Sequence, residues 1–515
     1  MRNIAIAKPG ITQGGKPLSG NGEPLMNLTD PFRCADGDKL REECGVFGAI
    51  GAPDAAAITA LGLHALQHRG QEAAGIVSFD GNEFFVRRGL GHVAENFSGQ
   101  EAIAALPGMM AAGHVRYSTT GGAGLRNVQP LYADLAAGGF AVAHNGNISN
   151  AATLRAELVS RGAIFQSTSD TEVIIHLVAT SRYPTLVDRL IDALRLVEGA
   201  FALVVMTPEG MIACRDPLGI RPLVMGRVGD ATLFASESVA FDVVGAEFIR
   251  EIEPGEMIEV GFEGNVRTLR PFGQHRPRPC VFEHVYFSRP DSVFAGRSVY
   301  EARKAIGSQL ALESPVDADL VVPVPDSGVP AAIGFAQTSG IPFELGIIRS
   351  HYVGRTFIQP SEGARHTGVR RKHNANRALV AGKRIVLIDD SIVRGTTSMK
   401  IVEMMRDAGA AEVHFRVASP PTAHSCFYGV DTPERSKLLA ARMEVEPMRD
   451  FIKADTLAFV SLDGLYRAVA GVDRDNAAPQ FCDACFSGDY PTSLTDLARA
   501  TNVDAQLSFP VGKVA

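Results

Sequence analysis

The segment that most constrains the fold of this chain is RIVLIDDSIVRGTTSMKIVEMMRDAG, residues 384–409. An unbroken apolar run ends in Asp389 and Asp390, and a loop rich in Ser, Gly and Thr then leads into a helical pattern. Strand, loop and helix in this order indicate a parallel sheet covered by helices. Because ligands of open α/β sheets bind beyond the carboxyl ends of the strands, both acids are predicted to lie at a binding crevice.

The chemistry of this segment suits a phosphorylated ribose. The stretch from Ser391 to Ser398 supplies backbone N–H groups, hydroxyls and a helix N-terminus, which together form an anion site. Two adjacent carboxylates can hold ribose hydroxyls or a hydrated Mg²⁺. The structural alternative is a solvated acidic pair beside a tight turn, which so extended a pattern disfavours.

These residues resemble the phosphoribosyl pyrophosphate signature of type I phosphoribosyltransferases. The resemblance implies that Asp389 and Asp390 engage the ribose and Mg²⁺. A second loop, VVPVPDSGVPAAIG, is similar to the family's pyrophosphate-side loop, and the similarity makes Ser327 a candidate Mg²⁺ ligand. The loop residues that would hold the 5′-phosphate are Ser391, Arg394, Gly395, Thr396, Thr397 and Ser398.

A basic segment, residues 351–377, lies between these two motifs. Taken alone, the segment could be an ordinary surface loop. Because it lies beside a pyrophosphate site, it is predicted to be a lid that excludes water. Its stretch YVGRTFIQP resembles the flexible loop of amidophosphoribosyltransferases, the glutamine-dependent enzymes that open purine biosynthesis. Tyr352 and Arg355 are therefore expected to contact phosphoribosyl pyrophosphate. Arg349, Ser350 and His351 stand where that family more often has Lys-Asn-Arg.

Such an enzyme needs a glutaminase, and the first half of the chain contains a candidate nucleophile. In ECGVFGAIG, Cys44 starts the first β-type run after a Gly- and Pro-rich leader. A lone cysteine in a strand is more often a small buried hydrophobe. The family resemblance implies instead that the leader is removed, that the Cys44 thiolate attacks the amide, and that its freed α-amino group, with a pKa of about 7.7–8.0, is the base.

Further glutaminase motifs follow in the order of the family. Arg116 in GHVRYSTTGG corresponds to the glutamine-carboxylate clamp, and Asp170 in STSDTEVI to the group that receives the α-ammonium. Asn145 and Gly146 in HNGNISN correspond to the oxyanion hole, and Arg69 in QHRGQE to a closing loop. Taken singly, these could be a surface ion pair, a helix cap and a hairpin turn.

Seven cysteines, an odd number, indicate a reducing compartment, and we expect a cytoplasmic protein. Four of them offer sulfur ligation that suits either zinc or an iron–sulfur cluster. The resemblance to the iron–sulfur subgroup of amidophosphoribosyltransferases implies a 4Fe-4S cluster. We expect this cluster to be structural, because neither half-reaction transfers electrons. Cys34 and Cys214 have no assigned partner. The four expected ligands are Cys280, Cys426, Cys482 and Cys485.

The length of 515 residues allows about three domains. We predict an α+β N-terminal-nucleophile hydrolase domain, a four-layer αββα sandwich, followed by an α/β type I phosphoribosyltransferase domain with a parallel sheet. The predicted limits are a leader at 1–43, a type 2 glutamine amidotransferase domain at 44–275, a phosphoribosyltransferase domain at 276–471 and a cluster-binding tail at 472–515.

The predicted reaction converts phosphoribosyl pyrophosphate, glutamine and water into 5-phosphoribosylamine, glutamate and pyrophosphate. A net charge of −7 argues against nucleic acid or anionic membrane as partners, and no apolar run is long enough to span a bilayer. From the resemblance we expect purine nucleotides as feedback inhibitors and a homo-oligomer, a dimer or tetramer.

Two rival functions each fit half of the chain. An amidotransferase that aminates a hexose phosphate would need a sugar-isomerase domain in place of the Asp389-Asp390 loop. A phosphoribosyl pyrophosphate-binding regulator would lack the glutaminase motifs and would carry a basic DNA-binding segment.

Overall fold

The computed structural model describes residues 44–117, 124–349 and 373–502. The predicted leader at 1–43 lies outside these residues, as do the candidate ligands Tyr352 and Arg355.

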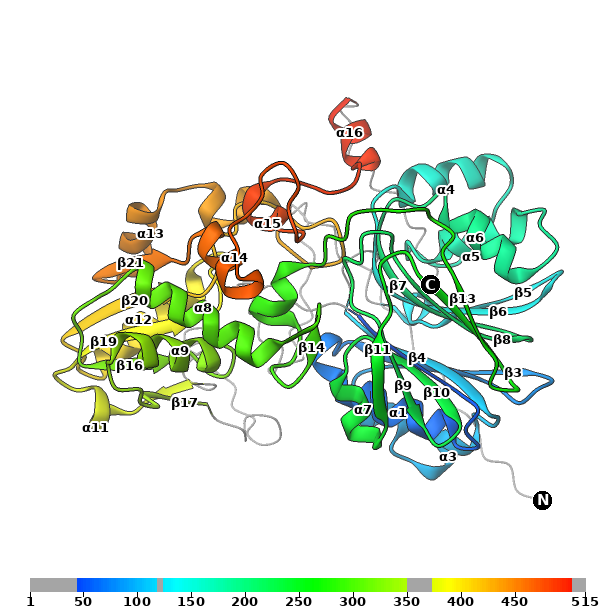
Figure 1. Ribbon diagram of the computed structural model, residues 1–515, viewed down its shortest axis with the longest axis horizontal. Helices are drawn as coiled ribbons and strands as arrows, with labels where there is room; N and C mark the ends of the chain where they lie inside the picture. The colour runs from blue at the N-terminus through cyan, green and yellow to red at the C-terminus, as the bar shows by residue number, and fades with distance from the viewer. Residues whose placement is uncertain (1–43, 118–123, 350–372, 503–515) are drawn as a thin grey trace, which may run out of the picture.

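Two antiparallel sheets form the first half of the molecule (Figure 1). The seven-stranded sheet has the order β11 (Glu247–Glu251), β9 (Val224–Val228), β10 (Ala231–Ala235), β1 (Gly45–Ile50), β4 (Met110–Arg116), β2 (Ala73–Phe79) and β3 (Phe84–Leu90). The six-stranded sheet has the order β13 (Val266–Leu269), β12 (Met257–Gly261), β8 (Gly210–Arg215), β7 (Gly199–Thr207), β6 (Gly138–Ile148) and β5 (Leu131–Leu135).

The alternation of side chains along β1 explains why the two sheets stack. Val46 and Ile50 belong to a core shared with the other sheet, whereas Phe47 and Ala49 pack toward the covering helices. At Gly48 the sheets come so close that a Cβ would lie 2.7 Å from side-chain atoms of β7 and β8. On the outer faces pack α1 (Ala55–Ala65), α2 (Val93–Phe97) and α7 (Val239–Val244) on one side, and α4 (Ala151–Ser160), α5 (Glu172–Thr180) and α6 (Leu186–Leu194) on the other.

This order of helix, sheet, sheet and helix confirms the predicted four-layer αββα sandwich. A short helix, α3 (Gln100–Ala104), precedes β4.

The second half contains the predicted parallel sheet. Along β19, Ile385 and Leu387 pack on one face, and Val386 and Ile388 on the other. Burial on both faces is the reason for the unbroken apolar run. The strand order is β16 (Leu320–Pro323), β19 (Arg384–Asp389), β20 (Glu412–Val417) and β21 (Thr456–Phe459). Helices α8 (Val299–Glu313), α9 (Val329–Ser339) and α14 (Leu462–Ala470) cover one face, and α12 (Thr396–Asp407) and α13 (Val445–Ile452) the other.

Shorter elements connect and flank these units. Residues 270–280, here called the linker, join the two halves without a helix or a strand, and the π-helix η3 (Glu283–Phe287) follows them. Strands β17 (Ile347–Arg349) and β18 (His373–Ala375) form an antiparallel pair beside the parallel sheet. The others are η1 (Gln67–Arg69), η2 (Leu125–Asn127), β14 (Val293–Phe294), β15 (Arg297–Ser298), α11 (Arg377–Val380), η5 (Arg435–Lys437), η6 (Leu439–Ala441), α15 (Ala484–Ser487) and α16 (Thr495–Asn502).

The C-terminal segment returns to the first half, where α16 lies beside α4 (Figure 1). The Asp496 carboxylate accepts hydrogen bonds from the backbone N–H groups of Ala152, at 2.7 Å, and Thr153, at 2.9 Å. Asn150, the N-cap residue of α4, makes no side-chain capping bond, so Asp496 satisfies these first-turn donors from a distant part of the chain.

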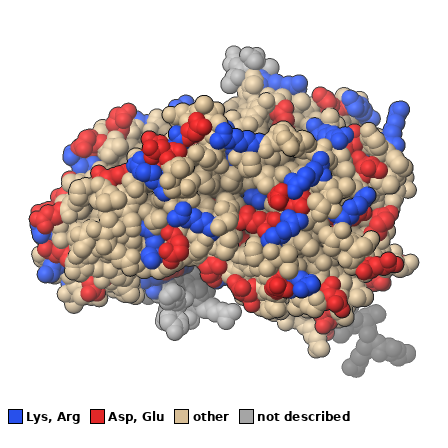
Figure 2. Space-filling model, viewed as in Figure 1, with Lys and Arg blue, Asp and Glu red and all other residues tan. Residues whose placement is uncertain are grey.

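Basic and acidic side chains are interspersed over the face shown in Figure 2. Across the three described ranges, no helix has the length and apolar character that a membrane span needs.

Candidate active sites

Cys44 directly precedes β1 and is half-buried. Its thiol donates a hydrogen bond to the carbonyl of Tyr117, with a sulfur–oxygen distance of 3.7 Å. The pairing of Gly45 with Val115 sets Cys44 beside the end of β4, where Arg116 is 4% exposed. The structure therefore brings the predicted nucleophile next to the predicted glutamine-carboxylate clamp.

Asn145 and Gly146 lie near the end of β6. Asn145 is fully buried, and its Nδ2 donates to Ser236 Oγ at 3.3 Å. Gly146 has a φ of +145°, and a Cβ there would lie 2.1 Å from the carbonyl oxygen of Ala200. Both the positive φ and the close approach of the Ala200 carbonyl therefore require a glycine at this position.

Asp170 stands just before α5, close to the end of β6. Its carboxylate accepts hydrogen bonds from the backbone N–H groups of Ile148, at 3.0 Å, and Thr171, at 2.9 Å. Nδ1 of His144 lies 3.9 Å from Asp170 Oδ2. Burial lowers the pKa of His144 below its ordinary value, although Asp170 opposes the shift. Asp170 is therefore anchored to the backbone of Ile148, two residues after Gly146. The imidazole of His144 beside it is neutral near pH 7.

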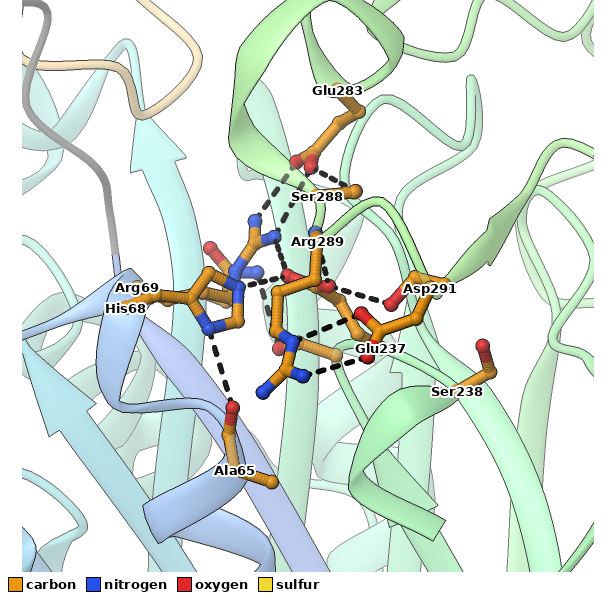
Figure 3. A network of polar contacts seen from close by, with 12 residues as sticks. Ala65, His68, Arg69, Glu237, Ser238, Glu283, Ser288, Arg289 and Asp291 are labelled. Atoms are coloured by element: carbon orange, nitrogen blue, oxygen red, sulfur yellow. Dashed lines mark hydrogen bonds and ion pairs between the residues drawn. The ribbon is translucent and has the colours of Figure 1, made fainter. Parts of the chain in front are cut away.

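Arg69, which was predicted to lie at a closing loop, belongs to a buried network of charged side chains. It ends the short helix η1, is 1% exposed, and lies between the carboxylates of Glu237 and Glu283 (Figure 3). Its guanidinium donates to Glu237 at 2.6 Å and to Glu283 at 2.8 Å, and its Nε donates to the carbonyl of Cys44 at 3.4 Å. Opposite charges on two sides hold it inside the protein, next to the predicted nucleophile.

The carboxylates around Arg69 also join the two halves. Glu237 accepts hydrogen bonds from His68 Nε2, at 2.7 Å, and from the Arg289 backbone N–H, at 2.9 Å, beyond η3 (Figure 3). Burial would raise the pKa of the Glu237 carboxyl, but His68 and Arg69 hold it well below its usual range. Glu283 behaves in the same way, since Arg69 and Arg221 outweigh its burial. Both carboxylates are therefore ionised throughout the neutral range.

Asp389 and Asp390 lie at the carboxyl end of β19, as predicted, and are 3% and 4% exposed. Asp390 Oδ1 accepts a hydrogen bond from Ser391 Oγ at 2.6 Å. Asp390 Oδ2 is buried and has no hydrogen-bond partner within the described residues. A buried carboxylate oxygen without a donor suits a cation or a ribose hydroxyl.

The predicted phosphate-binding stretch divides at Gly395, which has a φ of +79° and forms the N-cap of α12. Thr396, Thr397 and Ser398 consequently belong to the first turn of the helix, not to the loop that precedes it. The N-terminus of this twelve-residue helix and the preceding backbone present the donor groups expected of an anion site.

Ser327 follows β16 in the second predicted loop, where the peptide bond between Pro325 and Asp326 is cis. Its Oγ is buried and has no hydrogen-bond partner in the described part of the chain. Arg349, one of the residues that departs from the family pattern, forms an ion pair with Asp326. The two loops face the same edge of the sheet because β16 and β19 are parallel neighbours.

The four predicted ligand cysteines line one cavity, although they come from three distant segments. Cys280 and Cys482 form an isolated parallel bridge, and the sulfur of Cys426 accepts a hydrogen bond from the Tyr428 N–H at 3.3 Å. Burial raises the pKa of the Cys482 and Cys485 thiols, and neighbouring cysteines raise both further. In the residues that the structure describes, no group of three or more His, Cys, Asp or Glu side chains is arranged to hold a metal ion.

Sequence reasoning missed three buried polar residues: Ser236, Glu237 and Glu283. Ser236 Oγ accepts hydrogen bonds from both Asn145 and the backbone N–H of Val46, and both glutamates hold Arg69. Their partners lie in distant segments of the chain. The sequence signal for Ser236 and Glu237 is the polar Ser-Glu-Ser triplet, 236–238, directly after an apolar run, and Glu283 has no comparable signal.

Comparisons with known families agree with this division. Residues 114–243 match a glutamine amidotransferase domain, and residues 293–422 match a phosphoribosyl transferase domain. Together with the two sites, these domains define a glutamine-dependent phosphoribosyltransferase. Full-length relatives specify the family further. The chain belongs to the amidophosphoribosyltransferase family.

Among its relatives, amidophosphoribosyltransferase from Rhizobium etli is 59% identical over 466 residues, which cover 90% of this chain and 94% of the relative. The Bacillus subtilis enzyme is 50% identical over 88% of this chain and 95% of its own length. A solved structure of glutamine phosphoribosylpyrophosphate amidotransferase from B. subtilis, complexed with ADP and GMP, matches with a TM-score of 0.82 and 49% identity, covering 88% of this chain and 98% of that one.

The protein therefore forms 5-phosphoribosylamine, glutamate and pyrophosphate from phosphoribosyl pyrophosphate, glutamine and water. This reaction is the first committed step of de novo purine biosynthesis. The two rival functions are excluded. The second half of the chain is a phosphoribosyl transferase domain where a hexose-phosphate amidotransferase needs a sugar-isomerase domain. The first half contains a glutamine amidotransferase domain, which a phosphoribosyl pyrophosphate-binding regulator would not have.

Proposed function

We propose that Cys44 is the nucleophile of the glutaminase reaction, freed as the N-terminus by removal of residues 1–43. The α-amino group takes the proton of the thiol, and the resulting thiolate attacks the amide carbon of glutamine. The Asn145 side chain and the Gly146 N–H stabilise the tetrahedral oxyanion. When the intermediate collapses, the C–N bond breaks, the proton passes to the leaving nitrogen, and ammonia departs. Water then hydrolyses the thioester to glutamate.

The observation that carries this proposal is the meeting of the candidate residues at the ends of β1, β4 and β6. Cys44 lies beside Arg116 through strand pairing, and Ser236 joins β1 to Asn145. Arg116 would bind the α-carboxylate of glutamine through its planar donor fork, and Asp170 would bind the α-ammonium. Arg69 would hold the carbonyl of Cys44 through its Nε.

In the second half, we propose that Asp389 and Asp390 hold the ribose of phosphoribosyl pyrophosphate and that Ser391, Arg394, Gly395, Thr396, Thr397 and Ser398 hold its 5′-phosphate. Ammonia attacks the anomeric carbon as the bond to pyrophosphate breaks, and positioned charges stabilise the departing group. The orphan oxygens of Asp390 and Ser327 fit a hard cation. Mg²⁺ held there would neutralise charge on the pyrophosphate. Tyr352 and Arg355 are proposed to close over it.

We further propose that Cys280, Cys426, Cys482 and Cys485 hold a structural 4Fe-4S cluster. The four sulfur donors fit such a cluster, which is held by cysteine thiolates. The other side chains that line their cavity are mainly apolar and include Ile220, Phe282 and Val430. A single zinc ion would need all four sulfurs about 2.3 Å from one centre, whereas a four-iron cluster distributes them over four irons. When bound, the cluster would supply a covalent staple between the linker, the segment after β20 and the tail.

Iron analysis tests this staple. Anaerobically purified protein is expected to contain about four irons per chain and the broad visible absorption of a 4Fe-4S cluster. Cys482→Ser should lose most of the iron and lower the melting temperature, because the tail is released from the linker. Cys214→Ser, a change at a buried cysteine of the first half, is the control and should keep the iron. A zinc content of one per chain with no iron would refute the cluster.

The proposed domains are the type 2 glutamine amidotransferase domain at 44–275, the phosphoribosyltransferase domain at 276–471 and the cluster-binding tail at 472–515. We propose a cytoplasmic homo-oligomer, a dimer or tetramer, that purine nucleotides inhibit. The B. subtilis complex with ADP and GMP supports nucleotide binding in the family.

A further inference from the structure

The turn after β10 contains a serine that connects the two parts of the proposed glutaminase site. Ser236 is fully buried, and its Oγ accepts hydrogen bonds from the Val46 backbone N–H at 3.0 Å and from Asn145 Nδ2 at 3.3 Å. The backbone N–H of Ser236 in turn donates to the carbonyl of Val46 at 3.0 Å. Val46 is two residues after Cys44, so one residue contacts both the nucleophile strand and the oxyanion-hole side chain.

The atoms of this contact suit a positioning role. A serine hydroxyl has two acceptor lone pairs, and here the two N–H donors occupy them. An asparagine amide nitrogen carries two hydrogens, and Ser236 engages one of them. The second hydrogen is then directed by the plane of the amide. Fixing that plane fixes the donor that the developing oxyanion would meet.

We infer that Ser236 is a positioning residue for the glutaminase reaction: it orients the Asn145 amide toward the oxyanion formed on attack by Cys44. The inference rests on the proposed roles of Cys44 and Asn145. Glu237, the next residue, holds Arg69, which donates to the Cys44 carbonyl. Ser236 and Glu237 thus hold the start of the nucleophile strand through Val46 and Arg69. Ser236 also holds the side chain of Asn145.

The first test is the kinetic split in Ser236→Ala. An oxyanion donor acts on the tetrahedral intermediate and little on bound glutamine, so its misorientation lowers kcat and leaves KM nearly unchanged. We expect a glutaminase kcat lower by roughly 10- to 100-fold, below the full loss typical when an oxyanion donor is deleted. Ammonia-dependent synthesis should stay at the parent level. Rates are normalised to the fraction of chains that begin at Cys44.

Alkylation of Cys44 by iodoacetamide separates positioning from simple damage to the strand. The thiolate displaces iodide at a saturated carbon, and no oxyanion forms. Ser236→Ala should therefore keep the parent rate of alkylation while its glutaminase rate falls. The matched control is Ser78→Ala, which removes a buried hydroxyl of β2 in the same sheet. Ser78 Oγ has no hydrogen-bond partner in the described ranges, and its removal should leave both rates unchanged.

A double-mutant cycle completes the test. If Ser236 acts through Asn145, Ser236→Ala should cause no further loss of kcat in an Asn145→Ala background. Additive losses, a parallel fall in alkylation, or a kcat equal to that of Ser78→Ala would each overturn the inference. Failure of the proposed function would look different, because Asn145→Ala alone would then leave the glutaminase active.

Discussion

Cys44→Ser is expected to abolish glutamine-dependent synthesis of 5-phosphoribosylamine, by roughly 10³-fold or more, and to spare the reaction with ammonia. The serine hydroxyl has nearly the shape of the thiol but is scarcely ionised near neutral pH, so attack on the amide fails. Added ammonium salts supply the nitrogen directly to the second site. The measurement is initial rate with each nitrogen donor at saturating phosphoribosyl pyrophosphate.

The matched control for this change is Cys214→Ser, at a buried strand position in β8. Its thiol lies in the core of the six-stranded sheet, where burial raises the pKa and keeps it protonated. Both reactions should persist in this control. Loss of both reactions in Cys44→Ser would contradict two separable sites, and retention of both would remove Cys44 from the chemistry.

Asp390→Asn is expected to lower synthesis with either nitrogen donor by roughly 10²- to 10³-fold. The substitution keeps the size of the side chain but removes the charge on a buried oxygen that has no protein donor among the described residues. Both the ribose contact and the cation contact of the proposed site are weakened, and these serve the transfer step whatever the source of nitrogen. The assay is pyrophosphate release with glutamine and with ammonia.

Asp317→Asn is the control for this second change, since Asp317 is exposed and pairs with Arg384 at the amino end of β19. A surface pair of this kind contributes little to stability, so activity should be unchanged. A fall confined to the glutamine-dependent reaction in Asp390→Asn would contradict the assignment of this carboxylate to the transfer site.

The sequence could predict β19 and its acids because an unbroken apolar run followed by a helix has few other structural solutions. It could not place Arg69, because burial of that guanidinium depends on Glu237 and Glu283, which are remote in sequence. Ser236 was missed for the same reason. Local propensity also left the start of α12 uncertain, since the positive φ of Gly395 decides it.

The grouping of the four cysteines could be expected only from the family resemblance. Only Cys482 and Cys485 have an informative spacing, and a lone pair of this kind fits several chemistries. Their meeting with Cys280 and Cys426 at one cavity depends on the path of the tail between the two halves. That path follows from tertiary contacts, including the Asp496 cap of α4, which no local pattern predicts.

The central claim is that Cys44 acts as a free N-terminus, and intact mass spectrometry with N-terminal sequencing of active protein tests it most directly. We predict a chain that begins at Cys44, lacks residues 1–43, and gains one covalent adduct at Cys44 with a glutamine analogue that alkylates thiols. Fully active protein that still begins at Met1 would show that Cys44 does not act as a free N-terminus.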